Sequence, residues 1–315
     1  MHVQQIGEDQ LIRRLKRWAP GRVDVVCGIG DDCAVVRTGR RDPYDLLLKS
    51  DPVIEGVHFG PEASGASIGH KALGRVLSDL AAMGGEPLWI LVDLVVPPTA
   101  DVAHIESIYR GMAKLARRYG VAVVGGDTSC GPTLEVHVFA VGRIGRGKAI
   151  LRSGARPGDA LYVTGTLGGS GLGRHLRFEP RLREGQWLRD SGAVTAMMDV
   201  SDGLATDLRR MAAASGTGAV LDAACIPVSK AARQIKDKRS ALEHALTDGE
   251  DFELLFTVQR RKQKSFETAW QKNFGRPCTR IGEMTAKRGI VELCAGIHCE
   301  KLSLHGYEHF GRHLK

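Results

Sequence analysis

The chain has 315 residues, a hydrophobic content of 43%, a charged content of 25% and a formal net charge of +8. This composition is typical of a globular protein, and the length suffices for two domains. The longest apolar stretch, 87–96, contains Asp93 and is too short to cross a bilayer, so we expect no membrane span. The basic residues are dispersed and not interleaved with aromatic residues, which favours a solvated surface over a nucleic-acid interface.

The N-terminal segment and the cysteines both predict a cytoplasmic protein. The first residues lack the apolar stretch of a secretion signal and fit an amphipathic helix. The seven cysteines are odd in number and have no paired spacing, so we expect reduced thiols. Cys294, His298 and Cys299 offer the alternative of a zinc site, but the chain has no second pair of ligands.

The first half of the chain alternates segments of strand and helix character. Strands are expected at 45–51, 88–96, 121–124 and 134–144. A helix is predicted over 67–83, where Ile68, Ala72 and Val76 recur at helical spacing. A second helix is predicted over 104–119, with Gly120 as its C-cap.

The loop-rich stretch 146–159 separates two predicted domains, 1–148 and 149–315. After it we expect a strand at 160–164, a glycine-rich turn at 165–173, and a strand that ends near Asp199. A helix is predicted after Asp202, and later strands at 254–258 and 289–293. The predicted fold is therefore mixed α/β in two domains.

Seven short acidic motifs, each beside a glycine or a small polar residue, lie between residues 28 and 251. They are 28–32, 49–51, 77–79, 125–128, 199–203, Asp207 and 248–251. Carboxylates gathered at strand ends and helix starts repel one another unless cations lie among them. Mg²⁺, which bridges protein carboxylates to phosphates, is the usual cation, so phosphoryl chemistry is our first hypothesis.

Each motif also has a purely structural interpretation. Asp79 falls on the buried face of its helix, where it needs either a metal ion or an ion pair with Arg75. Asp202 is either an N-cap or part of a site with Asp199 and Ser201. The glycine motifs at 28–32 and 125–128 also fit plain turns. No Walker A motif, dinucleotide-binding motif or protein-kinase signature is present, so any ATP site must have a different architecture.

Taken in order, these motifs resemble the thiamine-monophosphate kinase family, within the superfamily of aminoimidazole ribonucleotide synthetase and selenophosphate synthetase. The resemblance covers nearly the whole chain, from 28–32 to 306–310. Its most specific segments are 77–84, 152–155, 199–204 and 249–254.

The resemblance implies an N-terminal α/β domain whose sheet pairs with that of a second subunit, a C-terminal α/β domain, and a homodimer. It implies ATP-dependent phosphorylation of thiamine monophosphate to thiamine diphosphate, with several Mg²⁺ ions and no general base. The implied Mg²⁺ ligands are Asp32, Ser50, Asp51, Asp79, Asp127, Asp199 and Asp202. The positions implied near ATP are Tyr109, Gly126, Asp127, Arg152 and Ser201, and those near thiamine monophosphate are His58, Glu250 and Tyr307.

Two residues depart from the family pattern. Lys49 stands where similar sequences often carry a small hydroxyl residue, which puts one metal contact in doubt, and Asp248 replaces a glycine and adds charge beside the predicted substrate pocket. Three alternatives stay open: another ATP-using enzyme of the superfamily, a non-catalytic metal- and nucleotide-binding dimer, and a nucleic-acid-binding protein. A selenophosphate synthetase is expected to carry a reactive cysteine or selenocysteine before a lysine, and a hydrogenase-maturation carbamoyl dehydratase to end in cysteine; neither feature is evident.

Overall fold

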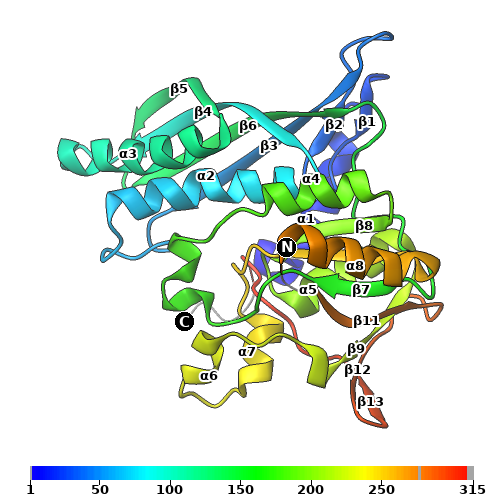
Figure 1. Cartoon of the computed structure of the whole chain (residues 1–315). Coiled ribbons are helices and arrows are strands. Elements are labelled where there is room, and N and C mark those ends of the chain that lie inside the picture. The colour runs from blue at the N-terminus through cyan, green and yellow to red at the C-terminus, as the bar shows by residue number, and fades with distance from the viewer. Residues whose placement is uncertain (1, 276–277, 311–315) are drawn as a thin grey trace.

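The structure, a computed structural model, describes residues 2–275 and 278–310 and contains two β-sheets (Figure 1). The N-terminal sheet has the strand order β1-β2-β3-β6-β4-β5. Its strands are β1 (Val25–Cys27), β2 (Ala34–Val36), β3 (Tyr44–Ile54), β4 (Glu86–Val96), β5 (Ala122–Cys130) and β6 (Glu135–Gly145). Neighbouring strands are antiparallel except β4 and β5, which are parallel because α3 connects them.

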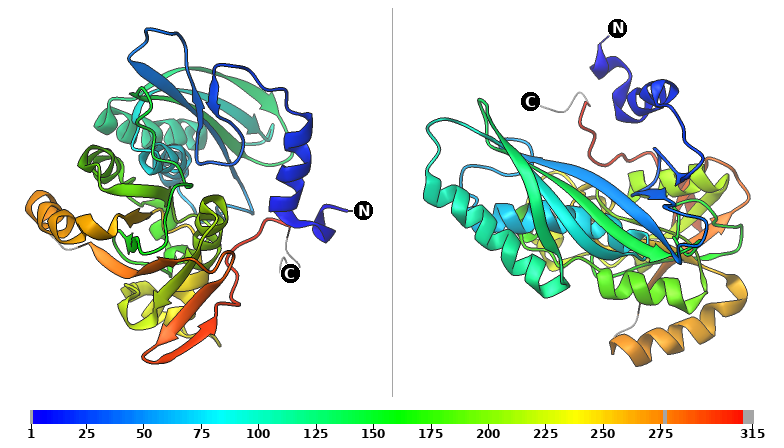
Figure 2. Two further views of the ribbon diagram at one scale, coloured as in Figure 1. Left: turned by 90° about the vertical axis from the view of Figure 1, so that its right-hand side faces the viewer. Right: turned by 90° about the horizontal axis from the view of Figure 1, so that it is seen from above.

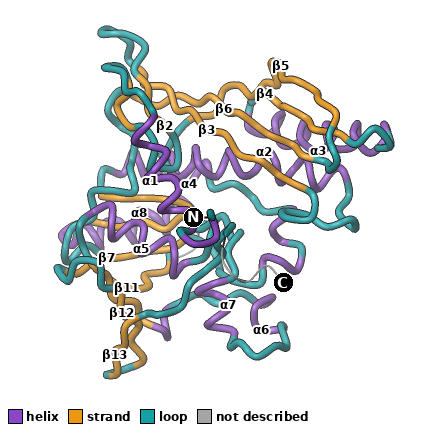
Figure 3. Tube along the Cα trace, turned by 180° about the vertical axis from the view of Figure 1, so that it is seen from behind, coloured by secondary structure: helices purple, strands orange, loops and turns teal. Residues whose placement is uncertain are grey.

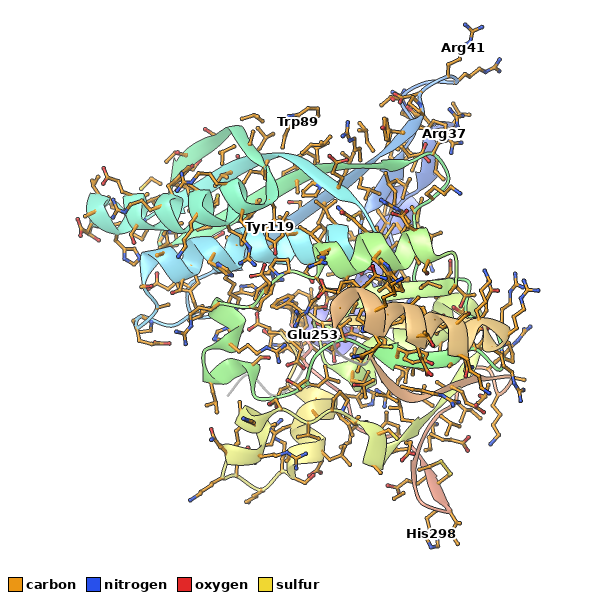
Figure 4. All side chains as sticks on the ribbon, in the orientation of Figure 1. Arg37, Arg41, Trp89, Tyr119, Glu253 and His298 are labelled. Atoms are coloured by element: carbon orange, nitrogen blue, oxygen red, sulfur yellow. A yellow bond between two sulfur atoms is a disulfide. The ribbon has the colours of Figure 1, made fainter. Side chains whose placement is uncertain are left out.

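Two long helices, α2 (Gly65–Ala82) and α3 (Val102–Tyr119), cover one face of this sheet (Figures 1 and 2). Ile90, Val92 and Leu94 alternate along β4 and are buried on that face. Residues between them point the other way, and Trp89 projects from the uncovered face (Figure 4). The N-terminal sheet is thus covered on one side only.

Glycines allow α2 and α3 to pack closely. A Cβ atom on Gly69 would lie 1.9 Å from the carbonyl oxygen of Ile108, and one on Gly111 would lie 2.0 Å from that of Ala66. Both obstacles are backbone atoms of the neighbouring helix, so relieving either clash requires the helices to separate. This contact fixes α2, which carries several residues of the site described below.

We expect Gly69→Ala to lower the free energy of unfolding by about 2 kcal/mol, since overpacking outweighs the better helix propensity of alanine. Urea denaturation measures the change. Gly21→Ala is the matched control, because a Cβ atom there meets nothing within 4 Å. Unchanged or higher stability of Gly69→Ala would contradict the close packing of the two helices.

The second sheet has the strand order β13-β12-β9-β11-β7-β10-β8. Its strands are β7 (Ala160–Val163), β8 (Val194–Asp199), β9 (Gly218–Asp222), β10 (Leu254–Val258), β11 (Thr279–Thr285), β12 (Val291–Ala295) and β13 (His298–Lys301). The helices of this half are α4 (Leu182–Ser191), α5 (Leu204–Ser215), α6 (Lys230–Gln234), α7 (Ala241–Thr247) and α8 (Gln263–Phe274). Short 3₁₀ segments are η1 (Val3–Gln5), η2 (Lys16–Trp18), η3 (Ser170–Leu172), η4 (Arg174–Leu176), η5 (Ala223–Cys225) and η6 (Arg260–Lys262).

One hydrophobic core cluster spans the two halves, and another lies within the C-terminal half. A single cluster of buried side chains includes Leu47 of β3, Leu77 of α2 and Phe256 of β10. The remaining helix, α1 (Gly7–Leu15), lies over the junction of the two sheets (Figure 3). The predicted domain boundary falls in the connection between β6 and β7, and the independence of the two domains stays a prediction.

The mixed α/β fold predicted from the sequence is confirmed, and each predicted strand and helix has a counterpart within a few residues. Gly120 is the C-cap of α3 in the left-handed conformation, as predicted. Five strands were not predicted: β1, β2, β9, β11 and β13. Each has only three to seven residues, too few for an alternation of apolar and polar side chains to stand out in the sequence. Among the described residues, no helix is both long enough and apolar enough to span a membrane.

The prediction that all cysteines are reduced is wrong for one pair. Cys294 and Cys299 lie opposite each other in the β12–β13 ladder and form a disulfide. A two-strand register, which cysteine spacing alone does not reveal, brings them together. The disulfide also excludes the zinc alternative at these residues, since both sulfur atoms are bonded.

Candidate functional site

A cavity of about 500 Å³ lies where both sheets, α2 and the two ends of the described chain meet. Its lining comes from segments far apart in the sequence: α1, the 28–32 loop, β3, α2, the β8–α5 connection, 248–252 and Tyr307. The helix α1 and the C-terminal segment lie side by side on this flank of the molecule (Figure 2). Five of the seven acidic motifs thus contribute to one cavity: 28–32, 49–51, 77–79, 199–203 and 248–251.

Three buried carboxylates, Asp32, Asp79 and Asp199, form what we call the acidic cluster. One oxygen atom of each lies within 4.8 Å of the others. Asp79 is in the last turn of α2, Asp199 is the final residue of β8, and Asp32 precedes β2. Three carboxylates, at or next to the ends of α2, β8 and β2, thus meet at one point.

The acidic cluster is electrostatically unfavourable without a cation. Burial, and then the neighbouring carboxylates, raise the pKa of Asp79 well above its usual range. Burial and the nearby Asp32 raise the pKa of Asp199 to about 7, although Ser78 Oγ donates a hydrogen bond of 2.6 Å to it. Oδ2 of Asp32 is buried and has no hydrogen-bond partner among the described residues. A buried oxygen atom without a hydrogen-bond partner is suited to coordinate a bound ion.

Cationic side chains surround the acidic cluster. Lys49 Nζ lies 3.0 Å from Asp79 Oδ1 and 3.7 Å from Asp51 Oδ2. Arg152 pairs with Asp32. Burial alone would raise the pKa of Asp51, but Lys49 and Arg75 outweigh it and lower that pKa.

The structural alternative for Asp79, an ion pair with Arg75, is wrong. Asp79 pairs with Lys49, whereas Arg75 pairs with Asp51 at 3.6 Å and with Glu250 at 3.5 Å. Arg75 is one turn before Asp79 on α2, but its guanidinium reaches across to other elements. The carboxylate of Asp79 therefore stays directed into the cavity.

Asp202 is not the N-cap of α5, since that position is occupied by Gly203, whose φ is 99°. The carboxylate of Asp207 instead accepts the backbone N–H groups of Ser201 and Asp202 at 3.1 and 3.0 Å. Burial raises the pKa of Asp207 well above its usual range. Asp202 pairs with Arg210 and lines the cavity. Asp207 thus holds the loop that presents Asp202.

A second charged group, which we call the cationic cluster, consists of Lys71 and Arg75 around Glu250, and the ring of His175 also contacts that carboxylate. Glu250 lies 2.7 Å from Lys71 Nζ and 3.0 Å from His175 Nδ1. Burial would raise the pKa of Glu250, but the hydrogen bond from His175 and the charge of Lys71 lower it to about 2. The backbone of Glu250 has a φ of 52°, which is uncommon for a residue other than glycine and often marks functional sites.

His58 and Tyr307 border the same part of the cavity. Burial, followed by the charges of Arg75 and Lys71, lowers the pKa of His58 to about 4, so its ring is neutral. Its Nδ1 accepts a hydrogen bond of 3.1 Å from the backbone N–H of Ile54, which leaves the other ring nitrogen as a donor. Tyr307 is 38% exposed, and its backbone N–H donates to the carbonyl of Asp202.

Comparisons with known proteins agree with this geometry. Residues 30–144 match the family model for the N-terminal domain of AIR synthase related proteins, and 156–294 match that for the C-terminal domain. The thiamine-monophosphate kinase of Escherichia coli K12 is 39% identical, over 96% of this chain and 98% of its own. That of Rhodopirellula baltica is 40% identical, over 90% of this chain and 92% of its own. This chain belongs to the thiamine-monophosphate kinase family.

The structure of AaThiL complexed with AMPPCP and TMP matches with a TM-score of 0.85 and 31% identity. The match covers 98% of this chain and 99% of that one. The family assignment therefore covers both sheets.

Most of the predicted site residues of this family member converge. The cavity is lined by Asp32, Ser50, Asp51, His58, Asp79, Arg152, Asp199, Ser201, Asp202, Glu250 and Tyr307. Tyr109, Gly126 and Asp127 do not line it, because they lie on α3 and on the edge strand β5. A Cβ atom on Gly126 would lie 1.9 Å from the carbonyl oxygen of Val92, so this glycine serves the contact between β4 and β5.

Sequence reasoning missed several residues of the site. Arg75, which lines the cavity, and Lys71, which is buried and pairs with Glu250, were not predicted as site residues. Lys71, Arg75 and Asp79 follow one another at intervals of four residues, one helical turn, along α2. That spacing was the available signal. Asp248 lines the cavity as predicted, but Gly169 N–H, His244 and Arg239 bind its carboxylate and compensate the added charge.

Proposed function

We propose that this protein transfers the γ-phosphate of ATP to thiamine monophosphate and so forms thiamine diphosphate. The observation that carries the proposal is the acidic cluster in one cavity with Arg75 and Glu250, in a chain 39% identical to a thiamine-monophosphate kinase. A bond forms between the γ-phosphorus and an oxygen of the acceptor phosphate, while the bond from that phosphorus to the bridging oxygen of ADP breaks. Negatively charged partners must approach one another, so the site has to supply positive charge.

We propose Mg²⁺ as the source of that charge. Asp32, Asp79 and Asp199 supply oxygen ligands of the kind Mg²⁺ prefers, and the orphaned Oδ2 of Asp32 supports the fit. Ser50, Asp51 and Asp202 border the same cavity and complete the proposed ligand set. Bound there, Mg²⁺ would neutralise the phosphates and help to align them for in-line transfer.

The protein groups are proposed to bind and orient the substrates. The acceptor phosphate is largely ionised near neutral pH, because its second pKa is about 6, so no general base is required. Arg152 supplies a fixed cation beside Asp32 for the ATP phosphates. The cationic cluster holds Glu250 toward the thiamine moiety, and Tyr307 offers an aromatic face to one of its rings.

We further propose that the functional unit is a homodimer formed through the uncovered face of the N-terminal sheet. Trp89, Leu91 and Val124 are 48%, 40% and 58% exposed on β4 and β5. A group of exposed apolar side chains on one sheet suits a second copy of the same chain. In such a dimer Asp127 of one protomer is available to the site of its partner, which accounts for its position outside the cavity of a single chain. Cytoplasmic location stays a prediction from the sequence.

Trp89→Asp is expected to convert the dimer to monomer and to lower activity together with it, because a charge on the apolar face disfavours association. Analytical ultracentrifugation measures the mass. Trp18→Asp is the matched control, since Trp18 is 86% exposed on the N-terminal segment. A dimeric Trp89→Asp protein would contradict this interface.

Incubation with Mg-ATP and thiamine monophosphate, followed by mass detection of thiamine diphosphate and ADP, tests the main proposal. Formation of both products separates an enzyme from a non-catalytic dimer. ADP formation without thiamine diphosphate would favour another ATP-using activity of the superfamily. Salt-sensitive binding of DNA or RNA, with neither product, would favour the nucleic-acid alternative.

A further inference from the structure

Lys49 lies among the aspartates that line the cavity. It belongs to β3, and its side chain, which is 23% exposed, extends into the cavity. Its ammonium contacts the carboxylates of Asp79 and Asp51, at 3.0 and 3.7 Å. Within residues 2–275 and 278–310, it is the cation that forms an ion pair with Asp79.

The charges around Lys49 show what it compensates. Asp32, Asp51, Asp79 and Asp199 carry four negative charges when ionised, and the carboxylates of Asp32, Asp79 and Asp199 are buried within 4.8 Å of one another. Arg152 pairs with Asp32 and Arg75 with Asp51, so each arginine forms its ion pair with a carboxylate other than Asp79. In the described part of the chain, Lys49 forms the ion pair with Asp79, while Arg75 acts on the same carboxylate at longer range.

An ammonium and a metal ion between Asp51 and Asp79 would interact differently with their surroundings. An ammonium is a compact point charge that donates hydrogen bonds, and it cannot bind a phosphate oxygen and a carboxylate as coordinated ligands. A small hydroxyl or amide side chain at position 49 would remove one positive charge and add a neutral oxygen. Either change favours a divalent cation between Asp51 and Asp79.

We propose that the ammonium of Lys49 takes the place of one divalent cation in this site. The wild-type chain therefore binds one divalent ion fewer than a variant with a small oxygen-bearing residue at position 49. This inference rests on the proposed function, since it assumes that the acidic cluster holds divalent ions. It concerns how the positive charge is divided between the protein and the bound ions.

Mn²⁺ binding to the nucleotide-free protein tests this role. The electron paramagnetic resonance signal of free Mn²⁺ is followed while the wild type and Lys49→Ser are titrated. We expect Lys49→Ser to bind one more Mn²⁺ per chain than the wild type, and Lys49→Arg, which keeps the charge, to match the wild type. Equal ion counts in wild type and Lys49→Ser would overturn the proposal, because Lys49 would then simply swing away when the ions bind.

Thermal unfolding gives a second readout. In EDTA, Lys49→Ser is expected to melt below the wild type, since Asp79 has lost its cation, and Mn²⁺ is expected to raise its Tm more than that of the wild type. Lys49→Gln, which keeps the volume of the stem and adds a neutral oxygen, replaces Lys49→Ser if the serine variant fails to fold in EDTA. Failure of both variants to fold even with Mn²⁺ would also overturn the proposal, because a divalent ion should restore the missing charge.

The outcome is separable from that of the proposed function. If the wild type forms no thiamine diphosphate, the proposed function fails, whatever the ion counts are. If the wild type is active but Lys49→Ser gains no ion, only the role of Lys49 fails.

Discussion

Asp79→Asn is expected to lower the rate of thiamine diphosphate formation by more than about 100-fold, which exceeds the usual effect of losing a second-shell partner of a metal ligand. Asp79 belongs to the acidic cluster and reaches it from the last turn of α2. The amide keeps the size of the side chain but supplies no negative charge. The proposed magnesium site therefore loses affinity while the fold persists. The steady-state rate at saturating Mg-ATP measures the loss.

Asp190→Asn is the matched control, since the side chain of Asp190 is 66% exposed and pairs with Arg189 outside the cavity. Circular dichroism and thermal unfolding check that Asp79→Asn is folded. The variant is expected to melt below the wild type in EDTA, because the ammonium of Lys49 loses its nearest counter-charge and keeps only Asp51 at 3.7 Å. Wild-type turnover in a folded Asp79→Asn protein would contradict a metal-binding role.

The convergence of the aspartates was predictable because their motifs end strands or start helices. Asp199 at the end of β8 and Asp79 on the buried face of α2 follow from hydrophobic periodicity alone. The partner of Asp79 was not predictable, because Lys49 and Asp79 are thirty residues apart and meet only through the packing of α2 on β3. Local spacing favoured Arg75 instead.

The position of Asp127 illustrates a second limit of sequence reasoning. Its motif predicts a ligand-binding turn, but β5 is an edge strand, and all its residues are exposed in a single chain. The motif alone does not show whether Asp127 contributes to the site of its own chain or to that of a second subunit. Similarly, Asp207 rather than Asp202 supports the start of α5: Gly203 occupies the N-cap position, Asp207 accepts the backbone N–H groups of Ser201 and Asp202, and Asp202 pairs with Arg210.

Glu250→Gln is expected to raise the KM for thiamine monophosphate by about tenfold, or about 1.4 kcal/mol, with little change in the KM for ATP. Glu250 pairs with Lys71, which is fully buried, and with His175. With its pKa near 2, the carboxylate is ionised at every pH at which the protein would be assayed. The amide leaves the buried ammonium of Lys71 without its counter-charge.

The pH dependence of KM distinguishes this role from a merely structural one. Burial lowers the pKa of Lys71 to about 8, and the charge of Glu250 is what limits that decrease. Removing the charge lowers the pKa further, so Lys71 in the variant loses its proton as the pH rises through a range where the wild type keeps it. The KM for thiamine monophosphate should therefore rise more steeply with pH in Glu250→Gln than in Glu106→Gln, a control at an exposed position on α3. A KM effect confined to ATP would contradict the assignment, because the cationic cluster would then face the nucleotide.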